Sequence, residues 1–304
     1  TETLTSKIVA AIRKGRKGGF TLAPESGSER LRKIINKDNT NEEILEAVRK
    51  ILSNGWQNVK LYFMLGLPLE NDDDILETVE LVRKICSLAR GFGKRVGITA
   101  SFSTFIPQPF TPFQWEKMAT PAEITAKQKI ILDGLKNIRN LKLSWHDQET
   151  STVEGYLSRA GRQFNNVIRY VADKMTGLQT EDNSFDADLW NEALEKNGID
   201  PLKISEEKSI DEPLPYEHLS MRIDRRFLLK EKARAYNLER TADCADGPCE
   251  ECGVCDFDKI KPLLRTGSVK DKKVPEKSEE NTNRGNSYPY IFTISKSGRG
   301  ISVG

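Results

Sequence analysis

Several features that would narrow the function of this protein are missing from its sequence. No apolar run approaches the roughly 18–20 residues that a bilayer span needs. The first residues, Thr1 to Leu4, lack the basic-then-apolar order of a signal peptide. Lysine and arginine (47) nearly balance aspartate and glutamate (45), so the net charge of +2 gives no bulk argument for a nucleic acid or a membrane as partner. These absences predict a cytoplasmic protein.

The residues that are present suit a globular protein. A chain of 304 residues can bury a sizeable core without disulfides, and 37% hydrophobic residues with 21 glycines is close to the globular average. Position 1 is threonine rather than methionine, and an alternating apolar stretch that begins at Tyr290 stops abruptly at Gly304. We therefore expect both ends to be cut from a longer chain.

Strand and helix patterns alternate from about Thr5 to Trp145, which predicts an α/β fold with at least four βα units around a parallel sheet. The expected strands are Phe20–Ala23, Val59–Leu65, Val96–Ile106 and Leu141–Trp145. The expected helices are Lys7–Lys14, Glu29–Ile35, Asn41–Asn54, the segment from the acidic turn Glu70–Asp74 to Ala89, and Pro121–Asn137. Thr40 and Glu43 have the spacing of a capping box.

Beyond Trp145 the pattern changes to helices and loops. These helices and loops are expected through 149–170, 185–195 and 226–236. Residues from about Thr266 to Asn286 have almost no apolar content, which predicts a solvated linker.

Two strand ends carry candidate site residues. Ala23–Leu31, with the sequence APESGSERL, follows the first expected strand, and Met64–Glu70, MLGLPLE, ends the second. Polar groups and glycines at the C-terminal ends of parallel strands can bind a ligand. Taken alone, each segment is more often a plain βα loop, the first with Ser26 or Ser28 as helix N-cap and Glu29 on the helix dipole.

The two segments together, about 40 residues apart on consecutive strands, resemble the radical S-adenosylmethionine (SAM) superfamily. The resemblance implies a partial TIM-like (β/α) barrel. It also implies that Glu25, Ser26 and Ser28 contribute to the site of the SAM ribose and amino acid. Leu65, Gly66 and Pro68 would then back the adenine.

Later segments are similar to a cobalamin-binding-type radical SAM family whose reaction is unassigned. They are Ser103–Trp115 (STFIPQPFTPFQW), Ser144–Asp147, Ser151–Gly155 and Ser158–Arg162. This similarity implies an N-terminal cobalamin-binding-type domain before the chain, a possible methyl transfer, and a radical-SAM-associated domain that begins near Tyr288. The implied domains are 1–147 for part of the barrel, 148–265 for a helical extension, 266–287 for a flexible linker and 288–304 for the start of a further domain.

The Cys-x3-Cys-x2-Cys motif of the superfamily, which holds the SAM-chelating [4Fe-4S] cluster, does not occur in the sequence. We expect the motif before Thr1, so this chain alone is expected to be inactive. The resemblance implies that the intact enzyme, reduced by a donor such as a flavodoxin or ferredoxin, cleaves SAM to methionine and a 5′-deoxyadenosyl radical. The substrate is not predicted by the sequence.

Four of the five cysteines, Cys244, Cys249, Cys252 and Cys255, lie within twelve residues. A cytosolic location disfavours disulfides, so the spacing predicts a metal site with thiolate ligands. Successive x2 spacings favour an auxiliary [4Fe-4S] cluster over structural zinc, which stays an alternative. Cys86 lies on an apolar helix face and is expected in the core.

The remaining charged residues are interpreted as structural. Arg159 and Arg162 are expected to form a solvated basic helix face, as is a group of three, Arg222, Arg225 and Arg226. A packing role is expected for His218, while His146, near the barrel mouth, suits a ligand contact or a structural role equally well.

Two other functions stay open. A methylthiotransferase-like modifier of RNA or protein would also use a second cluster, although no small β-barrel RNA-binding module is evident after the barrel. A zinc-stabilised binding module without catalysis is the non-enzyme alternative.

Overall fold

The computed structural model describes residues 19–93, 95–175, 185–244 and 249–255. The chain divides into two compact units, Thr1–Pro262 and Leu263–Gly304, and the second lies outside the described residues. The expected helix Lys7–Lys14, the linker 266–287 and the segment 288–304 also lie outside them. The domain boundaries at 147, 265 and 287 stay predictions.

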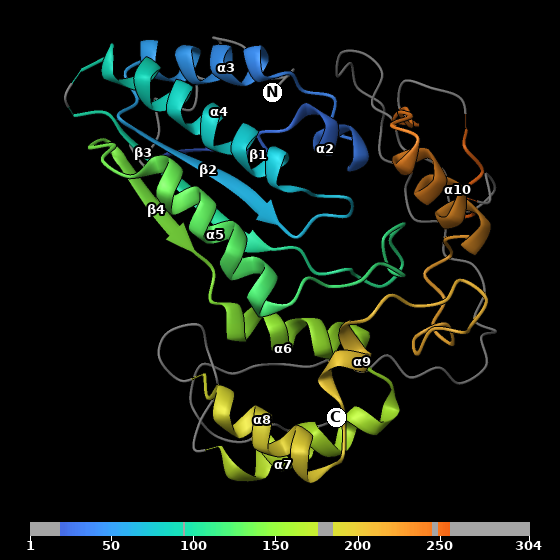
Figure 1. The fold of residues 1–304 in the computed structure, drawn as a ribbon. Coiled ribbons are helices and arrows are strands. Elements are labelled where there is room, and N and C mark those ends of the chain that lie inside the picture. Colours follow the sequence, from blue (N-terminus) through green and yellow to red (C-terminus); the bar gives the residue numbers. More distant parts are fainter. Residues whose placement is uncertain (1–18, 94, 176–184, 245–248, 256–304) are drawn as a thin grey trace, which may run out of the picture. The chain divides into compact units, whose positions relative to one another are not determined.

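In the described residues, four strands form one parallel sheet in the order β1-β2-β3-β4 (Figure 1). They are β1 (Phe20–Glu25), β2 (Asn58–Leu65), β3 (Gly97–Thr104) and β4 (Leu141–Trp145). Asn58 pairs with Gly97, and the register between β2 and β3 continues unshifted to Leu65 and Thr104. Parallel pairing of consecutive strands with helical connections confirms the α/β class.

Helices cover one face of this sheet. They are α3 (Asn41–Ser53), α4 (Asp72–Arg90) and α5 (Pro121–Leu135), whereas the short α2 (Glu29–Ile34) follows β1 and belongs to a separate apolar cluster. Figure 1 shows α3, α4 and α5 lying next to one another along the sheet, and α4 contacts both of the others. Val59, Leu61 and Phe63 of β2 are at most 1% exposed and belong to the core formed with these helices. Because side chains alternate along a strand, the three share the helix-covered face.

The other face of the sheet is polar and partly exposed. Lys60, Tyr62 and Met64 of β2 alternate with the core residues, and the side chain of Tyr62 is 37% exposed. Ser101 and Ser103 occupy equivalent positions on the paired strand β3 and are half-buried. An amphipathic parallel sheet with helices on one face is consistent with part of a (β/α) barrel, whose interior face is the polar one.

Capping boxes begin the helices as their sequences predict. The Thr40 hydroxyl accepts a hydrogen bond from the Glu43 N–H at 3.2 Å, and the Glu43 carboxylate accepts one from the Thr40 N–H at 2.8 Å. Asn71 and Asp74 make the same reciprocal pair at the start of α4. Each box satisfies two N–H groups that the first helical turn leaves without a partner.

The region after β4 is mainly helical, as predicted. Its described helices are α6 (Gln148–Arg159), the 3-10 turn η1 (Arg162–Phe164), α7 (Asn165–Lys174), α8 (Ala187–Lys196), α9 (Pro201–Ser205) and α10 (Arg225–Tyr236). Phe164, Val167, Trp190 and Ala193 are the centre of a core separate from that of the sheet. No helix in the described part of the chain is both long and apolar enough to cross a membrane.

The helix face expected to carry both Arg159 and Arg162 is wrong, because the chain leaves helical geometry at Ala160 and Gly161. Ala160 has φ −75° and ψ 157°, and Gly161 has φ −85° and ψ −173°, both extended. Glycine is a poor helix former, by about 1 kcal/mol relative to alanine. The break turns the chain so that α7 packs against α8.

Helix α10 returns to the sheet region. Ala235 near its end lies in an apolar cluster with Leu31 of α2 and Leu67, which follows β2. Leu228, which lies nearer the start of the same helix, packs with Trp115 and Leu214. The helix is therefore held close to the segments that follow β1 and β2.

Candidate functional site

The candidate site lies at the C-terminal edge of the sheet, where β1 and β2 end next to each other. Glu25, the last residue of β1, pairs with Phe63 of β2 after a register shift that begins beyond Leu22. Its φ of 68° is left-handed, a conformation that few residues other than glycine adopt. Glu25 Oε1 accepts from Lys37 Nζ at 2.7 Å, and the same ammonium group binds the Ala23 carbonyl at 2.9 Å.

Ser26 and Ser28 are buried, and their hydroxyls serve the turn itself. Ser26 Oγ accepts from the Ser28 N–H at 3.1 Å. Ser28 Oγ donates to Asp74 Oδ1 at 2.7 Å. Ser28 occupies the N-cap position of α2, but its side chain makes no capping bond, because its hydroxyl is engaged by Asp74. The expectation that Ser28 is the N-cap, with Glu29 in the first helical turn, is confirmed, but the cap has no side-chain hydrogen bond.

Gly27 rests directly on helix α4. Its N–H donates to Thr78 Oγ1 at 2.9 Å. A Cβ at this position would lie 2.2 Å from Thr78 Cα and 2.7 Å from the Glu77 carbonyl oxygen. Only glycine permits this approach, so the turn is seated against backbone rather than against a side chain that could move aside.

Asp74 is the buried anion that holds this turn. Besides Ser28, its carboxylate accepts from Arg30 Nη2 at 2.5 Å and from the Asn71 N–H at 2.9 Å. Burial acts to raise the pKa of Asp74, but the hydrogen bonds from Arg30, Asn71 and Ser28 outweigh it, so the pKa is lowered. The group therefore stays ionised at neutral pH.

Arg32 anchors the same turn from the other side. Its guanidinium is fully buried and donates to the Ser26 carbonyl at 2.6 Å, the Asn39 carbonyl at 2.7 Å and Asn41 Oδ1 at 2.8 Å. Burial lowers the pKa of Arg32, and Glu29, 3.8 Å away, opposes that shift. The Arg32 guanidinium therefore holds the carbonyl group of Ser26, the residue after Glu25, in place.

The exit of β2 is built around Gly66, whose φ is +83°. A Cβ there would lie 2.8 Å from Ala119 Cβ, and its N–H donates to Glu70 Oε1 at 2.9 Å. The Glu70 side chain is 2% exposed and pairs with Lys127 at 2.6 Å. Burial raises the pKa of Glu70, and Lys127 opposes the rise. The flanking Leu65 and Pro68 are buried, so this exit is also held by internal contacts.

The exits of β3 and β4 continue the edge. The Phe105 N–H donates to the Leu65 carbonyl at 2.8 Å, and the His146 N–H donates to the Phe102 carbonyl at 2.8 Å. His146 is half-buried, with Nε2 3.7 Å from Glu154 Oε2. The structure thus places His146 at the predicted edge, next to an acid.

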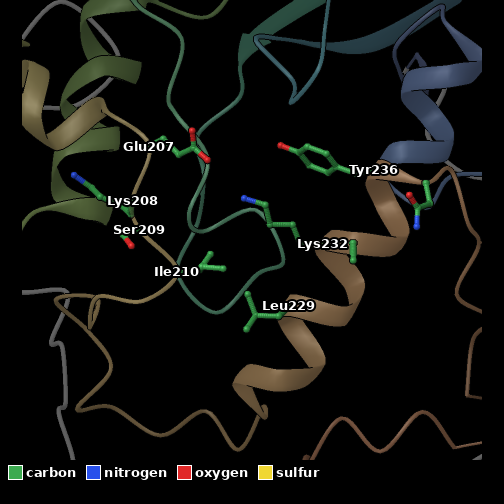
Figure 2. A pocket seen from close by; sticks show the side chains of 9 residues that line it. Glu207, Lys208, Ser209, Ile210, Leu229, Lys232 and Tyr236 are labelled. Atoms are coloured by element: carbon green, nitrogen blue, oxygen red, sulfur yellow. The ribbon is translucent and has the colours of Figure 1, made fainter.

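A hollow of about 860 Å³ lies between α10 and residues 207–210 (Figure 2). Tyr236 and Lys232 line it from the helix, and Ile210 lines it from the opposite segment. The Tyr236 hydroxyl lies 2.8 Å from both Glu116 oxygens, and Lys232 Nζ lies 2.6 Å from Oε1. Burial and Glu116 raise the pKa of Tyr236, so the phenol stays protonated.

The four-cysteine loop is described only in part. Cys244 and Cys249 are exposed, and Cys252 and Cys255 are half-buried. The Cys252 carbonyl accepts from the Asp224 N–H at 2.8 Å, and Gly253 turns the loop with φ +87°. Within the described ranges, no three His, Cys, Asp or Glu side chains are grouped as a metal would need. The donors suit a metal, whereas their arrangement here does not.

The structure tests the structural roles expected for one cysteine, two arginines and one histidine. Cys86 is fully buried in α4, and burial raises its pKa to about 12, so its place in the core is confirmed. Arg159 is 3% exposed rather than solvated, because its guanidinium binds carbonyl groups, and Arg162 is exposed in the separate turn η1. His218 is exposed rather than packed, with Nδ1 3.1 Å from the Pro215 carbonyl.

The basic group near α10 is largely neutralised by neighbouring acids. Arg226 pairs with Asp224 at 2.8 Å. Arg225 pairs with Glu217 and lies 5.6 Å from the centre of the Trp115 ring. These contacts favour a structural role for the group.

Residues 2–82 match the family model of the radical SAM superfamily. The match includes β1, β2 and both of their exit turns. The superfamily uses SAM and a [4Fe-4S] cluster in general, and the reduction of that cluster calls for an electron donor.

Two curated proteins are similar to parts of the chain. An uncharacterized protein of Methanocaldococcus jannaschii is 32% identical over 153 residues, which are 50% of this chain and 32% of that protein. The tRNA-2-methylthio-N(6)-dimethylallyladenosine synthase of Petrotoga mobilis is 31% identical over 84 residues, 27% of this chain and 19% of the enzyme. The chain thus spans a third or less of the length of these relatives. Together with the family match, they support a radical SAM assignment.

Proposed function

We propose that this chain provides the SAM-facing edge of a radical SAM enzyme. The observation that carries the proposal is the pair of turns after Glu25 and Leu65, which end adjacent parallel strands within the segment that matches the superfamily. A ligand seated there would meet groups from both turns at once. The substrate and the reaction on it are left open.

Glu25 is the residue proposed to contact SAM. One of its oxygens accepts from Lys37, while Oε2 has no partner among the described residues. The side chain is 20% exposed, so the free oxygen can accept from a ribose hydroxyl or an amine. Its left-handed backbone is a local strain of the kind that persists where surrounding contacts impose it.

Ser26, Ser28, Leu65, Gly66 and Pro68 are proposed to shape the same site. The two serines have their hydroxyls engaged by Ser28 N–H and Asp74, so they position the turn that presents Glu25. Gly66 lets the backbone turn after β2. Leu65, whose side chain belongs to the helix-covered core, and the buried Pro68 hold that turn in place behind the proposed adenine position.

A SAM-chelating cluster does not fit the residues present. The sequence contains no Cys-x3-Cys-x2-Cys, and Cys86 is enclosed in the core of α4. We therefore assign no chemical step to this chain's own thiols. Use of cobalamin, suggested by the similarity of Ser103–Trp115 to the cobalamin-binding-type family, stays part of the proposal.

A methylthiotransferase-like activity is the second candidate. The similarity to the Petrotoga mobilis enzyme favours it, and that enzyme's name describes a methylthio modification of tRNA. Such an activity would also use a second cluster, for which Cys244, Cys249, Cys252 and Cys255 are the available thiols.

The first test is SAM binding by the chain carrying Glu25→Gln. Removal of the negative charge takes away a charge-assisted hydrogen bond, so we expect SAM to bind about tenfold more weakly. Ligand-observed NMR titration measures such constants into the millimolar range. Glu80→Gln is the matched control, because Glu80 also pairs with a lysine, Lys84, but lies exposed on α4. Unchanged affinity in Glu25→Gln, or no SAM binding by the wild-type chain, would contradict the proposal.

The second test is metal content after anaerobic purification. We expect iron with acid-labile sulfide, lost in the double variant Cys252→Ser and Cys255→Ser. Cys86→Ser keeps the four-cysteine loop intact and should retain the metal. Zinc at one per chain would support a binding module instead, and a chain that holds neither metal would rule out a ligand role for the loop.

A further inference from the structure

A second, smaller cavity lies in the helical region, apart from the sheet edge. Its volume is about 370 Å³, and it is lined by residues between 159 and 163, between 198 and 204, and between 208 and 215. Three of the lining residues are cations, Arg159, Lys203 and Lys208. Two of the lining residues are acids, Asp200 and Glu212.

Arg159 brings a buried charge to this cavity without a matching counter-charge. It is 3% exposed and donates to the carbonyls of Ile204 at 3.1 Å, Glu206 at 2.8 Å and Gln114 at 3.5 Å. All three acceptors are neutral main-chain groups, and no carboxylate of the described residues lies within the 4.0 Å of an ion pair. A guanidinium has five N–H donors, so two remain available.

Lys208 adds a second cation to the lining of the same cavity. Its ammonium group donates to the Lys203 carbonyl at 2.5 Å, which leaves two N–H donors. Lys208 also lines the larger hollow, and Figure 2 shows its ammonium end directed away from Lys232 and Tyr236. Burial and the nearby Arg159 both lower the pKa of Lys208, which indicates that the two cations repel one another.

The acids around this pair are exposed or already engaged. Asp200 caps α9, with Oδ1 accepting from the Leu202 N–H at 3.0 Å. Glu206 and Glu212 act on Lys208 from exposed positions. Glu116, whose charge acts on Arg159, is bound by Lys232 and Tyr236. None of these groups neutralises the guanidinium inside the cavity.

We propose that the cavity binds a phosphate-class oxyanion between Arg159 and Lys208. A buried cation without a counter-charge is costly, and an anion between two such groups offsets the cost for both. A tetrahedral dianion can accept from several donors at once, and guanidinium groups match phosphate oxygens well. The volume accommodates a phosphate with a small organic group. The inference does not depend on the SAM site.

The test is titration of the whole chain with inorganic phosphate, followed by 31P NMR and calorimetry. We expect Lys208→Gln to weaken phosphate binding about tenfold, as the loss of one charge-assisted contact implies. Lys196→Gln removes an exposed lysine of α8 that does not line the cavity, and it should bind like the wild type. Lys208 lies in a loop, so its replacement leaves the buried Arg159 contacts in place.

Three results would overturn this inference. They are no phosphate binding at tens of millimolar, equal binding by Lys208→Gln and the wild type, and acetate binding as tightly as phosphate. Sulfate is expected to compete with phosphate, because it presents the same tetrahedral oxygens. If SAM binding is weakened in Glu25→Gln while phosphate binding is kept, the two sites are independent as proposed.

Discussion

Gly27→Ala is expected to lower the free energy of unfolding by roughly 3–4 kcal/mol, because it forces backbone apart and breaks a buried hydrogen bond. The new methyl carbon would lie 2.2 Å from Thr78 Cα and 2.6 Å from Thr78 N. Neither atom can move without displacing α4, and the Gly27 N–H would lose Thr78 Oγ1. Urea denaturation followed by circular dichroism measures the change.

Gly19→Ala is the control for this substitution. A Cβ at Gly19 would meet the Asn58 carbonyl oxygen at 3.4 Å, an ordinary contact. We expect a change within about 0.5 kcal/mol there. If Gly27→Ala unfolded at the same urea concentration as Gly19→Ala, the close seating of the turn on α4 would be wrong.

The second large effect is expected for Asp74→Asn, at about 3 kcal/mol. The substitution removes the charge that accepts from Ser28, Arg30 and the Asn71 N–H, and hydrogen bonds to a charged group contribute about 1.5–3 kcal/mol each. An amide retains part of this bonding, so the loss is smaller than the sum. Asp73→Asn, an exposed neighbour in the same helical turn, removes an equal charge and should change stability by less than about 0.5 kcal/mol.

The same substitution has a pH signature. The pKa of Asp74 is lower in the folded protein than in the unfolded chain, so its contribution is present above the unfolded value, near pH 4, and is lost as pH falls through the folded value. Asp74→Asn should therefore lose less stability between neutral pH and about pH 3 than Asp73→Asn does. If the free energy of unfolding fell equally with pH in both variants, the hydrogen-bond network assigned to Asp74 would be wrong.

Local patterns were sufficient to predict most of the fold. Strand Leu141–Trp145 and the capping box at Thr40 depend on neighbouring residues, and both are confirmed. The break after Arg159 lies at Ala160 and Gly161, whereas the partners of the Arg159 guanidinium, the distant carbonyls at Ile204 and Glu206, are contained in no local pattern. The glycine is a local signal for the break, but the burial of Arg159 follows from the fold.

The candidate site could be predicted only as two turns. Ser28 and Asp74 are 46 residues apart, and Tyr236 and Glu116 are 120 apart, so their pairing follows from the fold. For Asp74 a signal existed, because Asn71 and Asp74 have capping-box spacing, but that signal predicts a helix start and not a partner for a serine. The buried positions of Arg32 and Arg159 had no signal at all, since an arginine in a helix is normally exposed.

The position of α4 has a mechanical consequence. Its residues Asp74 and Thr78 hold the turn after β1, and Glu70, just before the helix, holds the Gly66 N–H after β2. Both turns are therefore bound to the same helix, and a displacement of α4 along its axis would carry them in the same direction. A ligand that bridges the two turns would meet a gap of nearly constant width, even when the helical layer shifts over the sheet.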